Sequence, residues 1–164
     1  MSIAAAMAQE LQHEAGVTRK YLERLPEDKF DFAPHAKSMK LGPLAGHLAE
    51  TPGWTEMTIQ TDEMVFDPAT YVPFVPKNRA EVLAKFDEAL AKGLAALQGV
   101  SDEHLMKPWR LKVGDHVLFE LPRVAVLRSM VLSHSVHHRA QLGVYLRMLD
   151  VPVPSTYGPS ADEQ

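Results

Sequence analysis

Near its C-terminal end the chain reads Ser133-His134-Ser135-Val136-His137-His138-Arg139-Ala140-Gln141. Residues four positions apart lie on the same face of a helix, so His134 and His138 can direct their rings toward one point. The apolar residues on either side keep the same helical spacing: Val124, Leu127, Val131, Leu142, Tyr145 and Leu149. This spacing predicts a long helix whose inward, core-facing side includes both histidines. A buried imidazole needs a partner, and a close pair favours a shared metal ion.

Amphipathic stretches and the breaks between them predict the rest of the fold. We expect helices over about residues 2–25, 41–61, 78–99 and 122–150, with Pro52 kinking or splitting the second. Residues 109–119 alternate loosely around a Gly-Asp pair and predict a short β-hairpin before the last helix. The expected fold is therefore all-α, a four-helix bundle whose long linkers allow crossover connections.

Length and composition fit one globular domain. The chain has 164 residues, 46% hydrophobic and 23% charged, and we expect a single domain over residues 1–164 with an extended tail at 151–164. A formal net charge of −4 and the lack of a basic run argue against nucleic-acid binding. No apolar stretch approaches the roughly 18 residues of a membrane span, and no signal-peptide pattern opens the chain. We expect a cytoplasmic protein that does not bind membranes.

The chain contains no cysteine. Disulfides, thiolate zinc sites and cysteine nucleophiles are therefore excluded, and histidines or carboxylates must hold any metal. A reaction that uses a thiol would need one brought by a low-molecular-weight cosubstrate.

A catalytic metal site typically has three protein ligands and an open position, so the histidine pair needs a third ligand. His47 is the best candidate, because it is the only other histidine on the inward face of a predicted helix. His137 is a rival on the flank of the last helix, with a solvent or dimer contact as the alternative interpretation. For each single histidine, a hydrogen-bonded core imidazole is the alternative to a ligand.

Three further polar residues lie near these histidines in the sequence. Glu50 is three positions after His47 and could act as a base, although a surface role is the commoner one for such a residue. Gln141 lies one turn beyond His138 and could bond the free ring nitrogen of that ligand. Arg139 points about a quarter-turn away, which favours a structural ion pair.

The segments Gly46-His47-Leu48-Ala49-Glu50 and His134-x-x-x-His138-Arg139-x-Gln141 resemble those of the DinB/YfiT-like metalloenzyme superfamily. The tail segments 149–154 and 157–160 resemble one branch of it, and the resemblance spans nearly the whole chain. It implies an up-down-down-up four-helix bundle, often a homodimer, and a divalent metal held by three histidines that match His47, His134 and His138. Some relatives are thiol-dependent transferases or isomerases and many have no known activity, so the resemblance supports the site better than the reaction.

A neutral three-histidine shell leaves the charge of a divalent metal uncompensated and favours an anionic fourth ligand. Two reactions of a small-molecule substrate follow: hydrolysis with Glu50 relaying protons, or transfer of a small thiol to an electrophile. The alternative is a non-catalytic metal- or ligand-binding helical-bundle dimer. Imidazole suits zinc, nickel, iron and manganese, and we rank zinc and nickel first.

Overall fold

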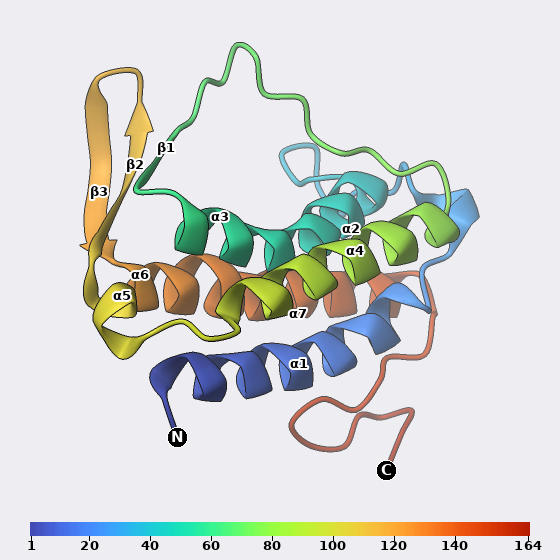
Figure 1. Ribbon diagram of the computed structural model, residues 1–164. Helices are drawn as coiled ribbons and strands as arrows, with labels where there is room; N and C mark the ends of the chain where they lie inside the picture. Colours follow the sequence, from blue (N-terminus) through green and yellow to red (C-terminus); the bar gives the residue numbers. More distant parts are fainter.

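A computed structural model describes residues 1–164, which form a mostly helical fold with one small sheet (Figure 1). The α-helices are α1 (Ile3–Leu22), α2 (Leu41–Glu50), α3 (Trp54–Gln60), α4 (Arg79–Leu97), α5 (Asp102–Met106), α6 (Arg123–Val126) and α7 (His134–Met148). Short 3-10 turns lie at Glu27–Lys29 and Thr51–Gly53, and a π-helical segment, Leu127–Ser133, joins α6 to α7. The strands are β1 (Glu63–Val65), β2 (Pro108–Val113) and β3 (His116–Pro122). No helix is both long and apolar enough to cross a membrane.

The long helices α1, α4 and α7 and the consecutive pair α2–α3 lie alongside one another (Figure 1). One core cluster of 15 buried residues is shared by α1, α2, α4 and α7. A second cluster, of 9 buried residues, joins the start of α1 to α3, α5, the end of α4 and the π-helical segment. Apolar faces at helical spacing therefore pair as the sequence predicts, and the core runs along the helices.

Local residue chemistry sets where the helices begin and break. The side chain of Asn78 caps α4 by accepting the Glu81 amide hydrogen bond at 2.8 Å, and the Glu81 carboxylate accepts from the Lys77 amide at 2.9 Å. The predicted break at Pro52 is confirmed, because the 3-10 turn Thr51–Gly53 separates α2 from α3. Proline lacks the amide hydrogen that would continue the α-helical ladder.

The predicted hairpin is confirmed as β2–β3, but the all-α prediction is incomplete. Strand β1 pairs in parallel with β2, with Glu63 opposite Arg110, and completes a three-stranded sheet of order β1-β2-β3. The sheet stands at the end of the helices, beside α3 and α6 (Figure 1). Three residues are too few to display a strand alternation, so β1 has no signal in the sequence.

The last helix departs from a regular α-helix over Leu127–Ser133, where the hydrogen bonds are of the π type. A π turn contains an extra residue, which rotates the positions that follow it. In the first two turns of α7 the buried positions are therefore Ser135 and Arg139, one residue after the predicted His134 and His138. Leu142 and Tyr145, further along the helix, are buried as predicted. The prediction that His134 and His138 occupy core positions is wrong in this respect, because both are half-buried at the edge of the core.

A buried ion pair lies on the other face of α7. The guanidinium of Arg139 donates to the Glu14 carboxylate at 2.7 Å and to the Thr18 hydroxyl at 3.2 Å. It also donates to the hydroxyl of Tyr157 at 2.6 Å, and that hydroxyl donates to Glu14 at 2.8 Å. Arg139 is 2% exposed and has the structural ion pair that the sequence predicts. The pair fixes α7 against α1.

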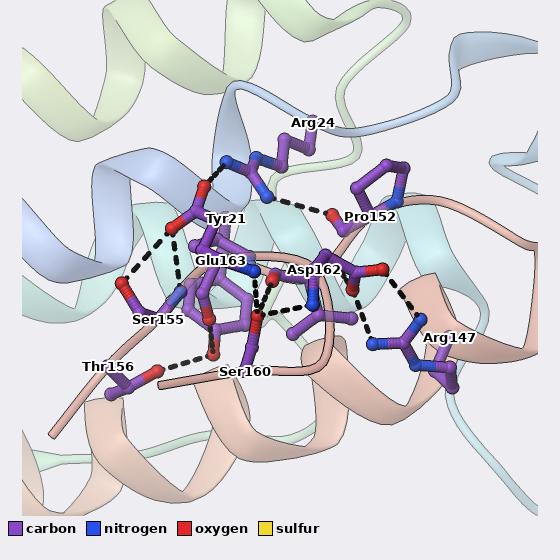
Figure 2. A network of polar contacts seen from close by, with 11 residues as sticks. Tyr21, Arg24, Arg147, Pro152, Ser155, Thr156, Ser160, Asp162 and Glu163 are labelled. Atoms are coloured by element: carbon purple, nitrogen blue, oxygen red, sulfur yellow. Dashed lines mark hydrogen bonds and ion pairs between the residues drawn. The ribbon is translucent and has the colours of Figure 1, made fainter. Parts of the chain in front are cut away.

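The tail after α7 contains no helix or strand but is held by polar contacts, shown in Figure 2. Glu163 accepts from the amide of Ser155 at 2.9 Å and forms an ion pair with Arg24, which follows the end of α1. The hydroxyls of Tyr21 and Thr156 are 2.6 Å apart. These bonds keep the extended residues 151–164 against α1 and α7.

The buried ion pair generates a stability prediction. Glu14→Gln leaves the Arg139 charge buried without a counter-ion, so the free energy of unfolding should fall by about 3 kcal/mol. Glu10→Gln is the matched control, because Glu10, also on α1, pairs at the surface with Arg128 of the π-helical segment. Loss of this surface pair should lower the free energy of unfolding by less than about 1 kcal/mol. Urea unfolding measures both, and equal effects would contradict the assignment.

Candidate metal centre

The structure brings three histidine rings together from two separate parts of the chain. His47 lies in the last turn of α2, and His134 and His138 lie in the first two turns of α7. The Nε2 atoms of His47 and His134 are 2.8 Å apart, and one ring nitrogen from each histidine lies within 4.8 Å of the others. The cluster joins residues 87 positions apart in the sequence.

Close backbone packing fixes the loop beside Gly46, the residue before His47. A Cβ atom at Gly46 would lie 2.5 Å from the carbonyl oxygen of Phe74 and 2.8 Å from the Cδ of Pro76. Glycine therefore allows residues 74–76 to lie directly against α2, one position from the candidate ligand.

Burial and mutual repulsion keep the three imidazoles neutral. Burial lowers the pKa of His134 to about 4, with smaller contributions from His138, His47 and His137. Burial is also the main cause of the lowered pKa of His47, and the neighbouring His138 lowers it further. The pKa of His138 is lowered by burial although its bond to Gln141 acts in the opposite direction. Neutral rings offer unshared electron pairs, which metal coordination requires.

The bond between His138 and Gln141 orients one ring. The Nδ1 of His138 lies 2.7 Å from the Oε1 of Gln141. An amide oxygen only accepts hydrogen bonds, so Nδ1 carries the hydrogen and Nε2 keeps its lone pair. The predicted contact between these two residues is therefore present, in the arrangement that supports many metal-binding histidines.

The donor set fits a divalent transition metal. Three imidazole nitrogens suit zinc, nickel or iron. Metal–nitrogen bonds of about 2.0 Å in a tetrahedral arrangement separate two ligand atoms by about 3.3 Å. The 2.8 Å between the Nε2 atoms of His47 and His134 is slightly shorter, so a small outward movement of the rings would admit an ion.

Glu50 and His137, the other residues predicted near the site, lie beside the cluster, and Trp54 also borders it. Glu50 is half-buried beside the cluster, and burial raises its pKa while Lys85 and the Phe74 backbone act in the opposite direction. His137 is exposed; its ring contacts that of His138 at 4.9 Å between centroids, but it does not belong to the cluster. Trp54 packs its ring 5.4 Å from His47 and 5.3 Å from His134, as a wall of the site.

An apolar chamber of about 290 Å³ opens beside His47 and Glu50. Nine of its twelve lining residues are hydrophobic, and they come from α3, β1, the loop after β1, β2, α6 and the π-helical segment. Sequence reasoning missed most of this chamber, including Met64, Trp109 and Met130. One signal was available, because Val126 and Met130 precede His134 and His138 at the same four-residue spacing.

Fold and site together define a helical protein with a candidate three-histidine metal centre at the edge of its core. The DinB family model matches residues 1–164, and the chain belongs to the DinB family. It is 26% identical over 152 residues to the uncharacterized protein YrdA of Bacillus subtilis (strain 168), covering 93% of this chain and 86% of YrdA.

Solved structures share the fold. A DinB-like protein from Bacillus cereus ATCC 10987 superposes with a TM-score of 0.74 at 20% identity, over 95% of this chain and 98% of that one. YfiT from Bacillus subtilis has a TM-score of 0.66 at 13% identity, over 90% of this chain and 87% of YfiT. YfiT is described as "a probable metal-dependent hydrolase with an unusual four-helix bundle topology".

Metal binding should depend on the clustered histidines alone. His134→Ala removes one of three donors, and the purified variant should lose stoichiometric metal while staying helical by circular dichroism. His137→Ala is the matched control, since its ring lies beside the cluster without joining it, and it should keep its metal. Elemental analysis measures both. Full metal content in His134→Ala would refute the centre.

In the metal-free protein, His134 should have a pKa well below that of an ordinary histidine. The pKa of His134 in the folded chain is about 4, and the usual value is 6.5. Between these values the unfolded chain binds a proton that the folded chain does not, so the free energy of unfolding falls as the pH drops from about 6.5 to about 4. NMR titration of the ring, assigned with His134→Gln, measures the midpoint. A midpoint near 6.5 would contradict the burial argument.

Proposed function

We propose that this protein is a metal-dependent enzyme whose divalent metal is held by His47, His134 and His138. The observation that carries the proposal is the convergence of three neutral imidazoles beside a chamber large enough for a small-molecule substrate. Sets of three protein ligands are typical of catalytic zinc sites, whereas structural zinc sites usually have four. Zinc and nickel are the metals we expect first, followed by iron and manganese.

Hydrolysis of a small-molecule substrate is the reaction we favour. A bound divalent metal would supply Lewis acidity, which polarises an electrophile and activates a water or thiol nucleophile. Glu50 lines the same chamber as His47, and its raised pKa suits a group that takes up and returns a proton. The description of YfiT supports this choice.

Thiol transfer is the second candidate reaction. Since the chain has no cysteine, a low-molecular-weight thiol would have to enter as a cosubstrate. Glu50 would then accept the proton of the thiol, and the electrophile would occupy the apolar chamber. The alternative to both reactions is a non-catalytic metal- or ligand-binding protein. A homodimer and the up-down-down-up helix order stay predictions.

Activity assays distinguish the two reactions from each other and from the non-catalytic alternative. The metal-loaded protein is screened against aryl and alkyl esters and amides, and against electrophiles together with small thiols. Activity that disappears on chelation and returns with metal supports the enzyme. Metal binding without turnover of either panel supports the non-catalytic alternative.

Glu50→Gln should lower kcat by about 100-fold or more while metal content stays unchanged, because the amide cannot accept a proton. Glu56→Gln is the matched control, since Glu56 lies on α3 and lines only the outer groove next to Glu50. Its kcat should stay within twofold of the unsubstituted protein. An unaltered kcat in Glu50→Gln would remove Glu50 from the proton-transfer role.

A further inference from the structure

The apolar chamber and the three-histidine cluster share one helix face. Val126 and Met130 line the chamber, and His134 and His138 continue the same four-residue spacing along α6, the π-helical segment and α7. His47 belongs to both places, because it lines the chamber and contacts His134. A molecule seated in the chamber therefore presents one end to the candidate metal centre.

The size of the chamber limits its occupant. Its volume of about 290 Å³ is at the lower end of the range for small-molecule sites, and about twice that of a cavity of roughly 150 Å³ that binds benzene. It fits one ring with a compact or branched substituent.

The chamber wall is both aromatic and adaptable. Trp54 and Trp109, the two tryptophans of the chain, line it together with Met57, Met64 and Met130. Tryptophan offers a large flat apolar surface, and methionine adapts its shape to a ligand without a polar cost.

Charge limits the occupant further. No lysine or arginine is among the lining residues, and Glu50 is the one carboxylate. Lys85 and Lys92 lie in the groove on the outer side of Glu50 and Trp54. A negative charge on the part of the ligand inside the chamber would meet Glu50 and no lysine or arginine, and a positive charge there would face the divalent metal of the proposed function.

We propose that the chamber selects an uncharged, compact apolar group, aromatic or branched aliphatic, so that the substrate of the centre is a neutral small molecule carrying such a group. The link between this group and the reaction rests on the proposed function. The preference for an apolar group rests on the lining residues, the exclusion of a cation rests also on the metal, and both can be tested without turnover.

A matched pair of probes tests the preference. Tert-butylbenzene and phenyltrimethylammonium have the same shape and differ by one positive charge, and neither offers an atom that coordinates a metal. Binding to the metal-loaded protein is followed by tryptophan fluorescence, because both tryptophans line the chamber. Tert-butylbenzene should bind saturably with a Kd at least tenfold lower than that of the cation. A lower Kd for the cation would reveal an aromatic cage for cations and would overturn the proposal. If neither probe binds saturably, the proposal is also overturned.

Two neighbouring residues on β1 provide a matched pair of variants. Met64 lines the chamber, whereas the side chain of Val65 points to the opposite face of the strand and is 52% exposed. Met64→Lys should weaken tert-butylbenzene binding at least tenfold, and Val65→Lys should leave the Kd within twofold. Equal effects would overturn the assignment of the chamber. The probe pair on the unsubstituted protein still decides the matter if Met64→Lys does not fold.

Metal content measured in the same samples keeps this proposal separate from the proposed function. Metal uptake and turnover without probe binding would overturn the chamber proposal alone. Selective probe binding without metal uptake would overturn the proposed function and would support the preference of the chamber.

Discussion

The arrangement of three neutral imidazoles at the edge of the core is the constraint on which the site depends. If two of these rings were in the doubly protonated, cationic form, their charges would repel each other at the 2.8 Å that separates the Nε2 atoms of His47 and His134. Helix packing keeps the three neutral rings together, since α2 and α7 are joined through the core cluster that includes Leu48 and Leu142. On the opposite face of α7, the buried pair of Arg139 and Glu14 fixes that helix against α1. The position of the histidines is thus set from both sides of one helix.

Much of this arrangement could be predicted because it depends on short-range spacing. The four-residue interval from His134 to His138 places both rings on one helix face, and Gln141 lies within reach of the second ring for the same reason. The break at Pro52 follows from a missing amide hydrogen. The ion pair of Arg139 was predicted from its angle on the helix, although its partner, Glu14, is 125 residues away and has no local signal.

The rest depends on features that leave no periodic trace in the sequence. After the π-helical segment Leu127–Ser133, the buried positions at the start of α7 are Ser135 and Arg139 in place of His134 and His138, and nothing in the composition of the segment distinguishes it from a regular helix. Strand β1 has only three residues, and its register is set by β2 across more than 40 positions of sequence. The apolar chamber combines side chains such as Met64, Trp109 and Met130, which tertiary structure alone brings together. Local pattern therefore predicts the ligands better than it predicts their surroundings.

The arrangement of the helices says little about the substrate, whereas the residues that line the apolar chamber say more. Solved structures at 13–20% identity keep TM-scores of 0.66–0.74, so the helical frame tolerates replacement of most side chains. Such a frame positions α2 against α7 but does not determine which residues cover the space between β1, β2 and α3. That cover is made here by two tryptophans and several methionines, with one carboxylate and no lysine or arginine. Because the energy of apolar burial depends on the atoms present and not on the backbone path, the substrate must be inferred from the chamber of this chain. For this reason a shared fold alone does not identify the molecule that reacts.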